Sequence, residues 1–518
     1  MRGHRTGSRG EIAVSMLGLW VLIALCSCSN APSDPPPSQV EPQLFQAAYR
    51  AITSRFLEPI SADALALAGL ERLTTVDPSV GVARGDRVIV LSQANKILQE
   101  LPAPGPDDIE GWGQLTDAIL RTARDKSAAV AALTRDRLDE TVLDGSVDLL
   151  DRFSRYAPPG IAAEHRDNRD GYGGIGVTVD AQGPDVRIAM VMPESPAAGA
   201  GLAPGDRITG VDGIDAVVLS HDEIIERLRG PVGSNLRLAV SRAGAGASLH
   251  FNLQRSHIVM KTVSLAHDDH IAVLRISVFN AGTADRLAEL LAQAHREMGN
   301  ALQGVVLDLR DNPGGLLDQS IRVASEFLDR GIVVSTLGRI REANQEFDVY
   351  NPGPVERLPV VVLVNGGSAS ASEIVAASLQ DNGRAVIVGT ASYGKGTVQN
   401  VIHLPNNGEL TVTWARLIPP GGYILHEHGV VPAVCTADLT DPAAPKQISS
   451  RPLAELDAGG WTALRYRCPP ERQDRDVDLE VAKRLLRDPG RYRQALADEP
   501  APAAAKPLRS ASVAQAAR

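Results

Sequence analysis

The sequence lacks the features of several protein classes. Its 518 residues contain no run of lysines and arginines, and 52 Lys and Arg against 62 Asp and Glu leave a net charge of −10. This balance argues against nucleic acid as the main partner. Neither Cys435 nor Cys468 has a C-x-x-C partner or a neighbouring histidine, so the sequence offers no zinc site and implies no metal or organic cofactor.

A hydrophobic run long enough to cross a membrane comfortably is also missing. The apolar run from Ile12 to Leu25 follows several arginines and is short for a span, so residues 1–27 are expected to be an export signal. The run ends in LCSC, which resembles a bacterial lipoprotein box with Cys28 as the lipidated residue, although Cys26 is unusual at its position. An uncleaved anchor and simple secretion stay open as alternatives. We expect a location on the periplasmic side of the cell envelope, with Cys28 as the membrane anchor and residues 28–42 as a Pro-rich tether.

Export would also decide the state of two of the four cysteines. Cys435 and Cys468 would enter an oxidising compartment, where a disulfide between them is expected. Both lie at or beyond the end of the region with recognisable motifs. Residues 436–518 are expected to be an extension with a helix over Asp476–Arg487 and a disordered Ala/Pro-rich end from Pro500.

The length and composition indicate a globular chain of two to four domains, with 44% hydrophobic and 22% charged residues. Leu44, Ala48, Ile52 and Phe56 fall four residues apart and would form one apolar stripe on a helix. Residues 60 to about 155, including the segment RVIVLSQANKILQEL, are read in the same way. The prediction is therefore a helical N-terminal region over residues 43–165, in which the stretch of about 76–140 serves core packing, oligomerisation or partner binding.

The rest of the chain is organised around the stretch from Val360 to Gln399. An apolar run, Val360–Val364, predicts a buried strand that ends at NGG, and serines then lead into a helical pattern. A second apolar run, 385–388, is followed by a Gly-rich turn that carries Lys395. A serine hydroxyl needs a base to become a nucleophile, and a lysine whose ammonium is destabilised by burial can serve.

Spacing alone leaves the chemistry of this stretch open. One helix and one strand can bring Lys395 back beside Ser370, which precedes it by 395 − 370 = 25 residues. The same residues also fit a helix cap with tight packing and a solvated lysine. Nothing in the spacing chooses among Ser368, Ser370 and Ser372.

The segments NGGSASASEI and GKGTVQ resemble the signature of the C-terminal processing (tail-specific) peptidases, S41-family serine proteases with a Ser/Lys dyad. The resemblance implies an α/β protease core over residues 257–435, with Ser370 as nucleophile, Lys395 as base and Gln399 orienting the lysine. The segment ALQGVVLDLRDNPGGLLDQS matches the same family. It implies one oxyanion donor at Gly314 or Gly315, left open between the two, and a second donor at Ala371.

Residues 171–256 change to short strands and turns and resemble a PDZ domain of the kind found in these proteases. Backbone N–H groups in the loop Gly174-Ile175-Gly176-Val177 could capture a terminal carboxylate, and the following strand edge could pair with an extended peptide. Ile225 and Leu228 on the next helix are candidate pocket or core residues. A small β-domain that packs without binding peptide is the alternative.

Three other functions fit the sequence less well. His426 and His428 could suggest a Ser/His/Asp hydrolase, but no G-x-S-x-G elbow lies near the serines. The spacing from Gly389 to Lys395 resembles a phosphate-binding loop, but Gly396 stands where a Ser or Thr is needed for magnesium. A non-catalytic PDZ scaffold of the cell envelope would not need the set of Ser370, Lys395 and Gln399.

We therefore predict a multidomain α/β protein with a helical N-terminal region, a PDZ β-domain and an α/β Ser/Lys protease core. Its expected function is that of an exported serine endopeptidase that binds apolar C-terminal tails of proteins and cleaves them through an acyl-enzyme. The sequence does not reveal the substrate, an adaptor protein, the oligomeric state, or whether the PDZ domain gates the site.

Overall fold

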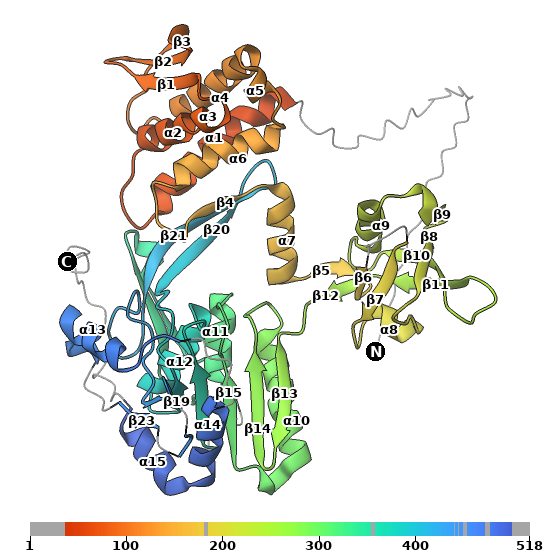
Figure 1. Ribbon diagram of the computed structural model, residues 1–518, viewed down its shortest axis with the longest axis vertical. Coiled ribbons are helices and arrows are strands. Elements are labelled where there is room, and N and C mark those ends of the chain that lie inside the picture. Colours follow the sequence, from red (N-terminus) through yellow and green to blue (C-terminus); the bar gives the residue numbers. More distant parts are fainter. Residues whose placement is uncertain are drawn as a thin grey trace, which may run out of the picture.

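The computed structural model describes residues 37–180, 185–353, 358–439, 441–443, 445–448, 453–471 and 477–499, apart from the side chains of residues 37–43 and 454. The expected export signal, Cys28 and the chain end from residue 500 lie outside the described residues. None of the described helices is long and apolar enough to span a bilayer. Figure 1 shows the helical N-terminal region above the α/β core, with a small β-domain beside them.

Helices packed around one core build most of the N-terminal region. The apolar stripe expected from the sequence is present, because Leu44, Ala48, Ile52 and Phe56 are all buried. They pack with the fully buried Trp112 and with residues of every neighbouring helix. The helices are α1 (Pro37–Arg55), α2 (Ala62–Glu71), α3 (Leu73–Val76), α4 (Ile109–Lys126), α5 (Ala128–Ala131) and α6 (Arg135–Val147).

One part of the helical prediction for residues 43–165 was wrong. The segment RVIVLSQANKILQEL forms two strands of an antiparallel sheet with the order β1-β2-β3. Ala94 and Asn95 both have positive φ (48° and 66°), which makes the tight turn between β2 and β3. Along the apolar run before this turn every second side chain is buried, including Ile89 and Leu91. This period of two is that of a strand and not of a helix. The strands are β1 (Val80–Arg84), β2 (Val88–Gln93) and β3 (Lys96–Pro102).

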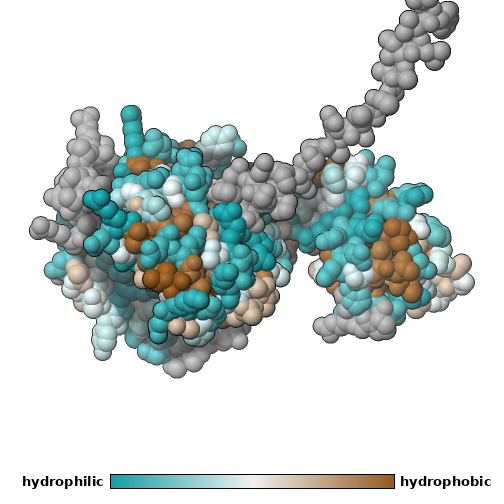
Figure 2. Space-filling model, turned by 90° about the horizontal axis from the view of Figure 1, so that it is seen from above, coloured by the Kyte–Doolittle hydropathy of each residue, from teal (hydrophilic) through white to brown (hydrophobic). Residues whose placement is uncertain are grey.

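The small β-domain, here the PDZ-like domain, joins the rest of the chain through helix α7 (Pro159–Asp170) and the pair β5–β12. Its sheet has the order β11-β10-β8-β7-β6, so β6 is an edge strand. Seen from above, the domain stands apart from the main body, and hydrophobic residues gather on its visible face (Figure 2). Its elements are β5 (Tyr172–Gly174), β6 (Val177–Asp180), β7 (Arg187–Val191), α8 (Pro196–Ala200), β8 (Arg207–Val211), β9 (Ile214–Asp215), α9 (His221–Leu228), β10 (Asn235–Ser241), β11 (Leu249–Gln254) and β12 (Ser256–Ile258).

A seven-stranded sheet with the order β13-β14-β15-β18-β19-β22-β23 forms the core of the protein. Strands β14, β15, β18, β19 and β22 run parallel, and β18 is buried at all five residues because helices cover both faces. Helices α10, α11 and α12 pack on one face, and α14 and α15 pack on the other. The elements are β13 (Val263–Asp268), β14 (Ile271–Ile276), α10 (Thr283–Met298), β15 (Gly304–Asp308), α11 (Leu317–Ser325), β18 (Val360–Val364), α12 (Ala371–Asp381), β19 (Val386–Gly389), β22 (Val434–Cys435), β23 (Lys446–Gln447), α14 (Val477–Arg487) and α15 (Pro489–Ala497).

A second sheet connects this core to the N-terminal region. It has the order β17-β16-β21-β20, with β4 added beside β21. The hairpin of β20 and β21 places Leu404, Leu410 and Val412 in the hydrophobic core of the N-terminal helices, so the two regions share one interior. The strands are β4 (Arg155–Ala157), β16 (Ile332–Gly338), β17 (Gln345–Asp348), β20 (Thr397–His403) and β21 (Glu409–Ile418).

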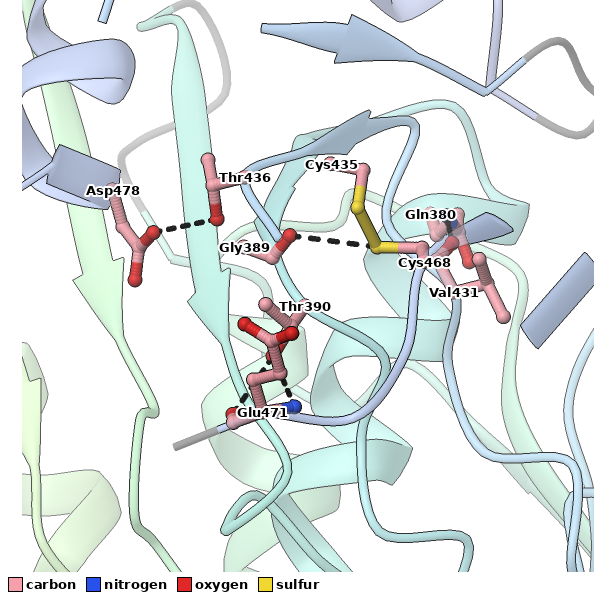
Figure 3. The surroundings of a disulfide bond; sticks show 9 residues. All are labelled: Gln380, Gly389, Thr390, Val431, Cys435, Thr436, Cys468, Glu471 and Asp478. Atoms are coloured by element: carbon pink, nitrogen blue, oxygen red, sulfur yellow. Dashed lines mark hydrogen bonds between the residues drawn. A yellow bond between two sulfur atoms is a disulfide. The ribbon is translucent and has the colours of Figure 1, made fainter. Parts of the chain in front are cut away.

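The C-terminal extension is part of the fold. Helix α13 (Ala458–Arg467) ends at Cys468, which forms a disulfide with Cys435 at the end of β22 (Figure 3). The helix expected over Asp476–Arg487 is α14, and it covers the sheet face opposite α12. The C-terminal extension therefore covers the face of the core sheet opposite α12.

Candidate active site

The parallel strands bring the candidate residues to one edge of the core sheet. Strands β15, β18 and β19 are neighbours and point the same way, so the segments that follow them meet at their carboxyl ends. These segments carry Gly315, Ser370 and Lys395. All three line one cleft of about 950 Å³, together with Ala371 and Gln399.

The structure distinguishes Ser370 from the two neighbouring serines. Ser368 and Ser372 are fully buried, and their hydroxyls donate to the carbonyls of Leu309 (2.8 Å) and Asn312 (2.9 Å). These two serines therefore fix the loop to the glycine turn after β15. Ser370 lines the cleft and has φ 57°, ψ −114° at the N-cap of α12. Positive φ is costly for a serine and is found where a sharp turn exposes a side chain.

A buried carboxylate ties the Ser370 loop to the Lys395 loop. Glu373, in the first turn of α12, accepts hydrogen bonds through Oε2 from the main-chain nitrogens of Ser370 (2.7 Å) and Lys395 (2.9 Å). Its Oε1 accepts from the hydroxyl of Ser392 (2.5 Å) and the nitrogen of Gly394 (2.6 Å). Complete burial raises the pKa of Glu373, and the four hydrogen bonds oppose that rise. Glu373 thus sets the separation of the two loops.

Lys395 has a half-buried side chain at the wall of the cleft. Burial, and after it the charge of Arg155, lower the pKa of Lys395, whereas Glu373 and Asp151 act in the opposite direction. Its Nζ lies 5.2 Å from the centroid of the Phe153 ring. Within the described part of the chain, no hydrogen bond joins this nitrogen to the hydroxyl of Ser370.

Gln399 lines the cleft but directs its amide elsewhere. Its Nε2 donates to the hydroxyls of Thr397 (2.9 Å) and Thr413 (3.2 Å). Among the described hydrogen bonds, none connects Gln399 to Lys395. An orienting contact between them would therefore need a turn of one of the two side chains.

The glycine turn after β15 approaches the serine loop closely. A Cβ on Gly314 would lie 2.7 Å from Ser370 Cβ and 2.9 Å from the Ala371 nitrogen, and Gly314 has φ 101°, so only glycine fits. The Gly314 N–H donates to the side chain of Asn312 (2.9 Å) and is already occupied. The Gly314 carbonyl accepts from Phe279, so the Gly315 N–H of the same trans peptide points the opposite way. Gly315 and Ala371 line the cleft.

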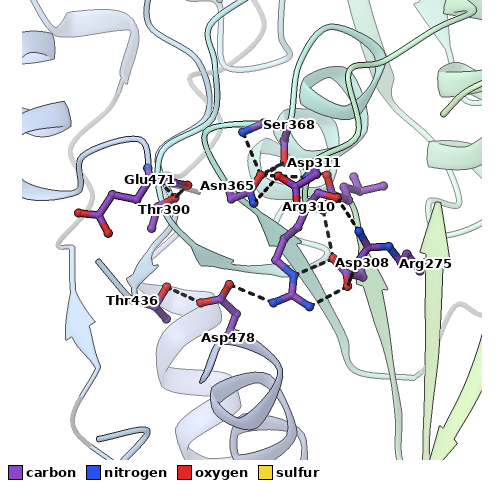
Figure 4. A network of polar contacts seen from close by, with 12 residues as sticks. Arg275, Asp308, Arg310, Asp311, Asn365, Ser368, Thr390, Thr436, Glu471 and Asp478 are labelled. Carbon is purple, nitrogen blue, oxygen red and sulfur yellow. Dashed lines mark hydrogen bonds and ion pairs between the residues drawn. The ribbon is translucent and has the colours of Figure 1, made fainter. Parts of the chain in front are cut away.

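An ion-pair network holds the strand ends beneath this turn (Figure 4). Arg310 makes a bidentate pair with Asp308, at 2.9 and 2.8 Å, and reaches Asp478 of α14 at 3.2 Å. Asp311 and Asn365 exchange two hydrogen bonds between the β15 and β18 loops. These groups brace the turn.

The C-terminal extension contacts the loops behind Ser370 and Lys395. The Glu471 carbonyl accepts from the hydroxyl of Thr390 and from the nitrogen of Gly366, each at 2.9 Å. Arg465, three residues before Cys468, donates to the carbonyls of Ser392 (3.2 Å) and His428. The disulfide thus attaches to β22 a segment, residues 465–471, whose hydrogen bonds support the loops that carry Ser370 and Lys395.

The arrangement contradicts two alternatives for this site. His426 and His428 do not line the cleft, and His428 Nδ1 pairs with the Ile424 carbonyl at 2.8 Å. The Gly-rich loop before Lys395 gives its N–H groups to Glu373, so a carboxylate occupies the place where a phosphate would bind. Within the described residues, no group of three or more His, Cys, Asp or Glu side chains is placed to hold a metal ion.

Comparison with known proteins identifies the family. The model of peptidase family S41 matches residues 270–435, and the model of the PDZ domain matches residues 164–241. The carboxy-terminal-processing protease of Bartonella bacilliformis is 37% identical over 363 residues, which cover 68% of this chain and 83% of that protein. The chain belongs to the C-terminal processing proteases of family S41.

Further proteins are similar to parts of this chain. The carboxyl-terminal-processing protease of Synechocystis is 34% identical over 282 residues, covering 52% of this chain and 65% of that protein. A solved photosystem II D1 C-terminal processing protease aligns over 76% of this chain and 92% of its own, with 23% identity and a TM-score of 0.39. The protein is a serine-type peptidase with a PDZ domain, and the expected multidomain α/β fold is confirmed.

The PDZ domain of this protease has a groove between the edge strand β6 and helix α9. The groove encloses about 340 Å³ and is lined by Ile175, Gly176, Val177, Ile225 and Leu228, among others. Gly174 does not line it, because this residue pairs with Ser256 in the β5–β12 connection.

The loop at the end of this groove has two carbonyls that face the domain interior. The carbonyls of Ile175 and Gly176 accept from Ala197 (3.0 Å) and Met192 (2.8 Å). The N–H groups of Gly176 and Val177 therefore point to the other side. A Cβ on Gly176 would lie 2.3 Å from Ser195 Cβ, so this position requires glycine.

Sequence reasoning missed two residues of the site. Glu373 stands three residues after Ser370, the spacing of a capping box, and this signal could have marked it as a partner of the helix start. Phe153 left no such signal. It lies 395 − 153 = 242 residues before Lys395, and only the packing of β4 against β21 brings it beside this lysine.

Proposed function

We propose that the protein is an exported endopeptidase in which Ser370 is the nucleophile and Lys395 the general base. The observation that carries the proposal is the double role of Glu373, whose Oε2 accepts from the main-chain nitrogens of both residues. Family S41 membership and the shared cleft support the same assignment. A carboxylate that positions two loops in this way is expected where their side chains must meet.

The proposed reaction begins with neutral Lys395. Its amine takes the proton of the Ser370 hydroxyl while the oxygen attacks the scissile carbonyl. The negative oxygen of the tetrahedral intermediate is held by the N–H groups of Gly315 and Ala371. Lysine then returns the proton to the leaving amine, and water, activated by the same base, hydrolyses the acyl-enzyme. Gln399 orients the lysine once its side chain has turned toward it.

Gly315 is the better candidate for the oxyanion donor of the glycine turn. The Gly314 N–H is occupied by Asn312, whereas Gly315 lines the cleft. Ala371 begins helix α12, and the N-terminus of a helix favours negative charge. The two donors therefore come from the carboxyl ends of adjacent parallel strands, β15 and β18.

Substrate delivery is assigned to the PDZ domain. An extended peptide would add to the free edge of β6, with its terminal carboxylate at the loop of Gly176 and Val177. The apolar lining by Ile225 and Leu228 supports apolar C-terminal residues as the ligand. Asn168 and Met260 line both this groove and the cleft of Ser370, which supports the transfer of a bound tail from one to the other.

We further propose that residues 1–27 are an export signal and that Cys28 carries a lipid anchor on the periplasmic side. The tether expected over residues 28–42 is shorter than the sequence predicted, because helix α1 already begins at Pro37. Domain boundaries at residues 37–165, 171–256, 257–435 and 436–518 complete the proposed organisation. The disulfide of Cys435 and Cys468 supports export, since such bonds persist in oxidising compartments.

Removal of the dyad tests the proposed chemistry. Ser370→Ala and Lys395→Ala should each reduce the cleavage rate of a labelled peptide by several orders of magnitude. Lys395→Arg should be equally inactive, because arginine does not release its proton. Mass spectrometry of the fragments should show new C-termini only with the unmodified enzyme. Full activity of the Lys395→Arg enzyme would exclude lysine as the base.

A substitution in the groove tests the delivery step. Ile225→Asp should raise KM for a protein with an apolar tail and leave the cleavage of a short internal peptide unchanged. Val217→Asp is the matched control, since Val217 is 86% exposed on the same domain and does not line the groove. Equal KM values for the two variants would contradict tail capture by this groove.

A further inference from the structure

An aromatic ring from the N-terminal region lies beside the proposed base. Phe153 stands between helix α6 and strand β4, and its ring centroid is 5.2 Å from Nζ of Lys395. A cation within about 6 Å of a ring centroid and over its face is attracted by the ring's electrons. A neutral amine gains little from this contact, so the ring favours the charged form of the lysine.

The position of Phe153 is fixed by its neighbours on the chain. The carboxylate of Asp151 accepts from the nitrogens of Phe153 (3.2 Å) and Ser154 (2.8 Å). The Ser154 hydroxyl accepts from the nitrogen of Thr413 in β21 (3.1 Å), which ties this turn to the second sheet. The ring is therefore held by the backbone on both sides rather than by the lysine itself.

Other side chains complete the surroundings of the ring. The guanidinium of Arg152 lies over the Phe153 ring at 4.8 Å and over the Tyr393 ring at 5.5 Å. His426 meets the ring edge to face at 5.9 Å. The charged and titratable groups that face Lys395 or this ring from the packed elements are Asp151, Arg152, Arg155, Glu373 and His426, and Tyr393 contacts Arg152.

We propose that Phe153 is a positioning residue that holds the Lys395 ammonium in the resting enzyme, away from Ser370. The described hydrogen bonds include none between Lys395 and Ser370, which agrees with a lysine held elsewhere. Catalysis then requires the lysine to lose its proton and leave the ring for the serine. The inference rests on the proposed function, because it takes Lys395 as the base.

The expected consequence is that the Phe153 ring influences the pH dependence of kcat/KM through the pKa of Lys395. Burial and Arg155 disfavour the ammonium, and the Phe153 face opposes them. Phe153→Leu keeps an apolar side chain but removes the aromatic face that attracts the ammonium. The acidic limb of the pH profile of kcat/KM should therefore move to lower pH by about half a unit. At pH values well below the limb, the Leu variant should then be about threefold more active than the parent enzyme.

The experiment is a pH–rate profile of the full-length protein with a short peptide substrate. Phe153→Tyr is the matched control, since tyrosine keeps the aromatic face, and its limb should coincide with that of the parent. A ring-fluorinated phenylalanine at position 153 keeps the shape and weakens the face, so it should shift the limb in the same direction as leucine. Thermal unfolding of each variant provides the folding control.

Each outcome decides the proposal. A downward shift with leucine and the fluorinated residue but not with tyrosine supports it. Equal limbs in all variants, or a uniform loss of rate without a shift, would overturn it and leave Phe153 with a structural role. Failure of the proposed function is distinguishable, because it would appear as activity retained by Lys395→Arg, whatever residue 153 does.

Discussion

Glu373 lies 2.9 Å from the main-chain nitrogen of Lys395, through the same Oε2 atom that accepts from the nitrogen of Ser370. One atom in the first turn of α12 thus joins the loop of Ser370 to the loop of Lys395. Because the carboxylate is fully buried, no water can replace its four hydrogen bonds without rearrangement. The relative position of Ser370 and Lys395, the proposed dyad, therefore depends on a third residue, Glu373.

Glu373→Gln should lower kcat with little effect on KM. An amide can accept at only one of the two positions and presents a donor to N–H groups at the other. Loss of a hydrogen bond to a charged group is worth about 1.5–3 kcal/mol, or about a 10- to 150-fold fall in kcat. Steady-state kinetics with a short peptide measures it. The exposed Glu342→Gln is the control and should change nothing.

The closeness of the glycine turn to the serine loop leads to a second prediction. Gly314→Ala should abolish most activity and reduce the free energy of unfolding by about 1–3 kcal/mol, since its Cβ would meet Ser370 Cβ at 2.7 Å. Gly160→Ala in α7 is the control, because a Cβ there meets nothing within 4 Å. An active and fully stable Gly314→Ala enzyme would show that the two loops are farther apart in solution.

The disulfide should support activity as well as stability. Replacing Cys435 and Cys468 by serine together should reduce the free energy of unfolding by about 2–4 kcal/mol. It should also lower kcat, because Arg465 would hold the Ser392 carbonyl less firmly. Urea unfolding and peptide kinetics, each with and without a thiol reductant, measure both effects. Reductant should change the parent protein and leave the double variant unaffected.

Arg465→Ala separates the two contributions of this segment. It keeps the disulfide and removes the guanidinium that reaches Ser392 and His428. We expect kcat to fall while the sensitivity to reductant remains. An unchanged kcat would mean that the disulfide acts on stability alone.

Two buried carboxyls should make the protein less stable at alkaline pH. Burial raises the pKa of Glu499 to about 8 and that of Asp381 to about 7. Both folded values lie above the value of about 4 in an unfolded chain, so the stabilisation is fully present below about pH 4 and is lost progressively until the pH has risen through 7 for Asp381 and 8 for Glu499. The melting temperature should fall over this interval.

Glu499→Gln tests which carboxyl is responsible. The wild-type carboxyl accepts from the Ile387 nitrogen and the Gln380 amide, each at 2.7 Å, and anchors the chain after α15. Its replacement by a neutral amide should flatten the decline near pH 8, and Asp381→Asn should flatten it near pH 7. Melting curves between pH 5 and 9 provide the measurement. Parallel declines in parent and variants would assign the effect to other groups.

Some of the site was readable from local sequence. The buried strands β18 (Val360–Val364) and β19 (Val386–Gly389) follow from uninterrupted apolar runs. Ser370 and Lys395 each follow one of these strands along the chain, which predicts that both lie at the same edge of the sheet. The stripe from Leu44 to Phe56 likewise fixed a helix face. The segment before and after Asn95 was misread, because a short apolar run fits either period and the turn alone identifies it as a hairpin.

The sequence by itself determined the parts whose cause is local: strands, helix starts, and a serine and a lysine carried by loops that leave adjacent strands. Only the tertiary structure decided which N–H group of the glycine turn is occupied, that Glu373 joins both loops, and that Phe153 meets Lys395. These contacts join residues far apart along the chain, and their geometry depends on the packing of whole sheets, which short-range patterns do not encode.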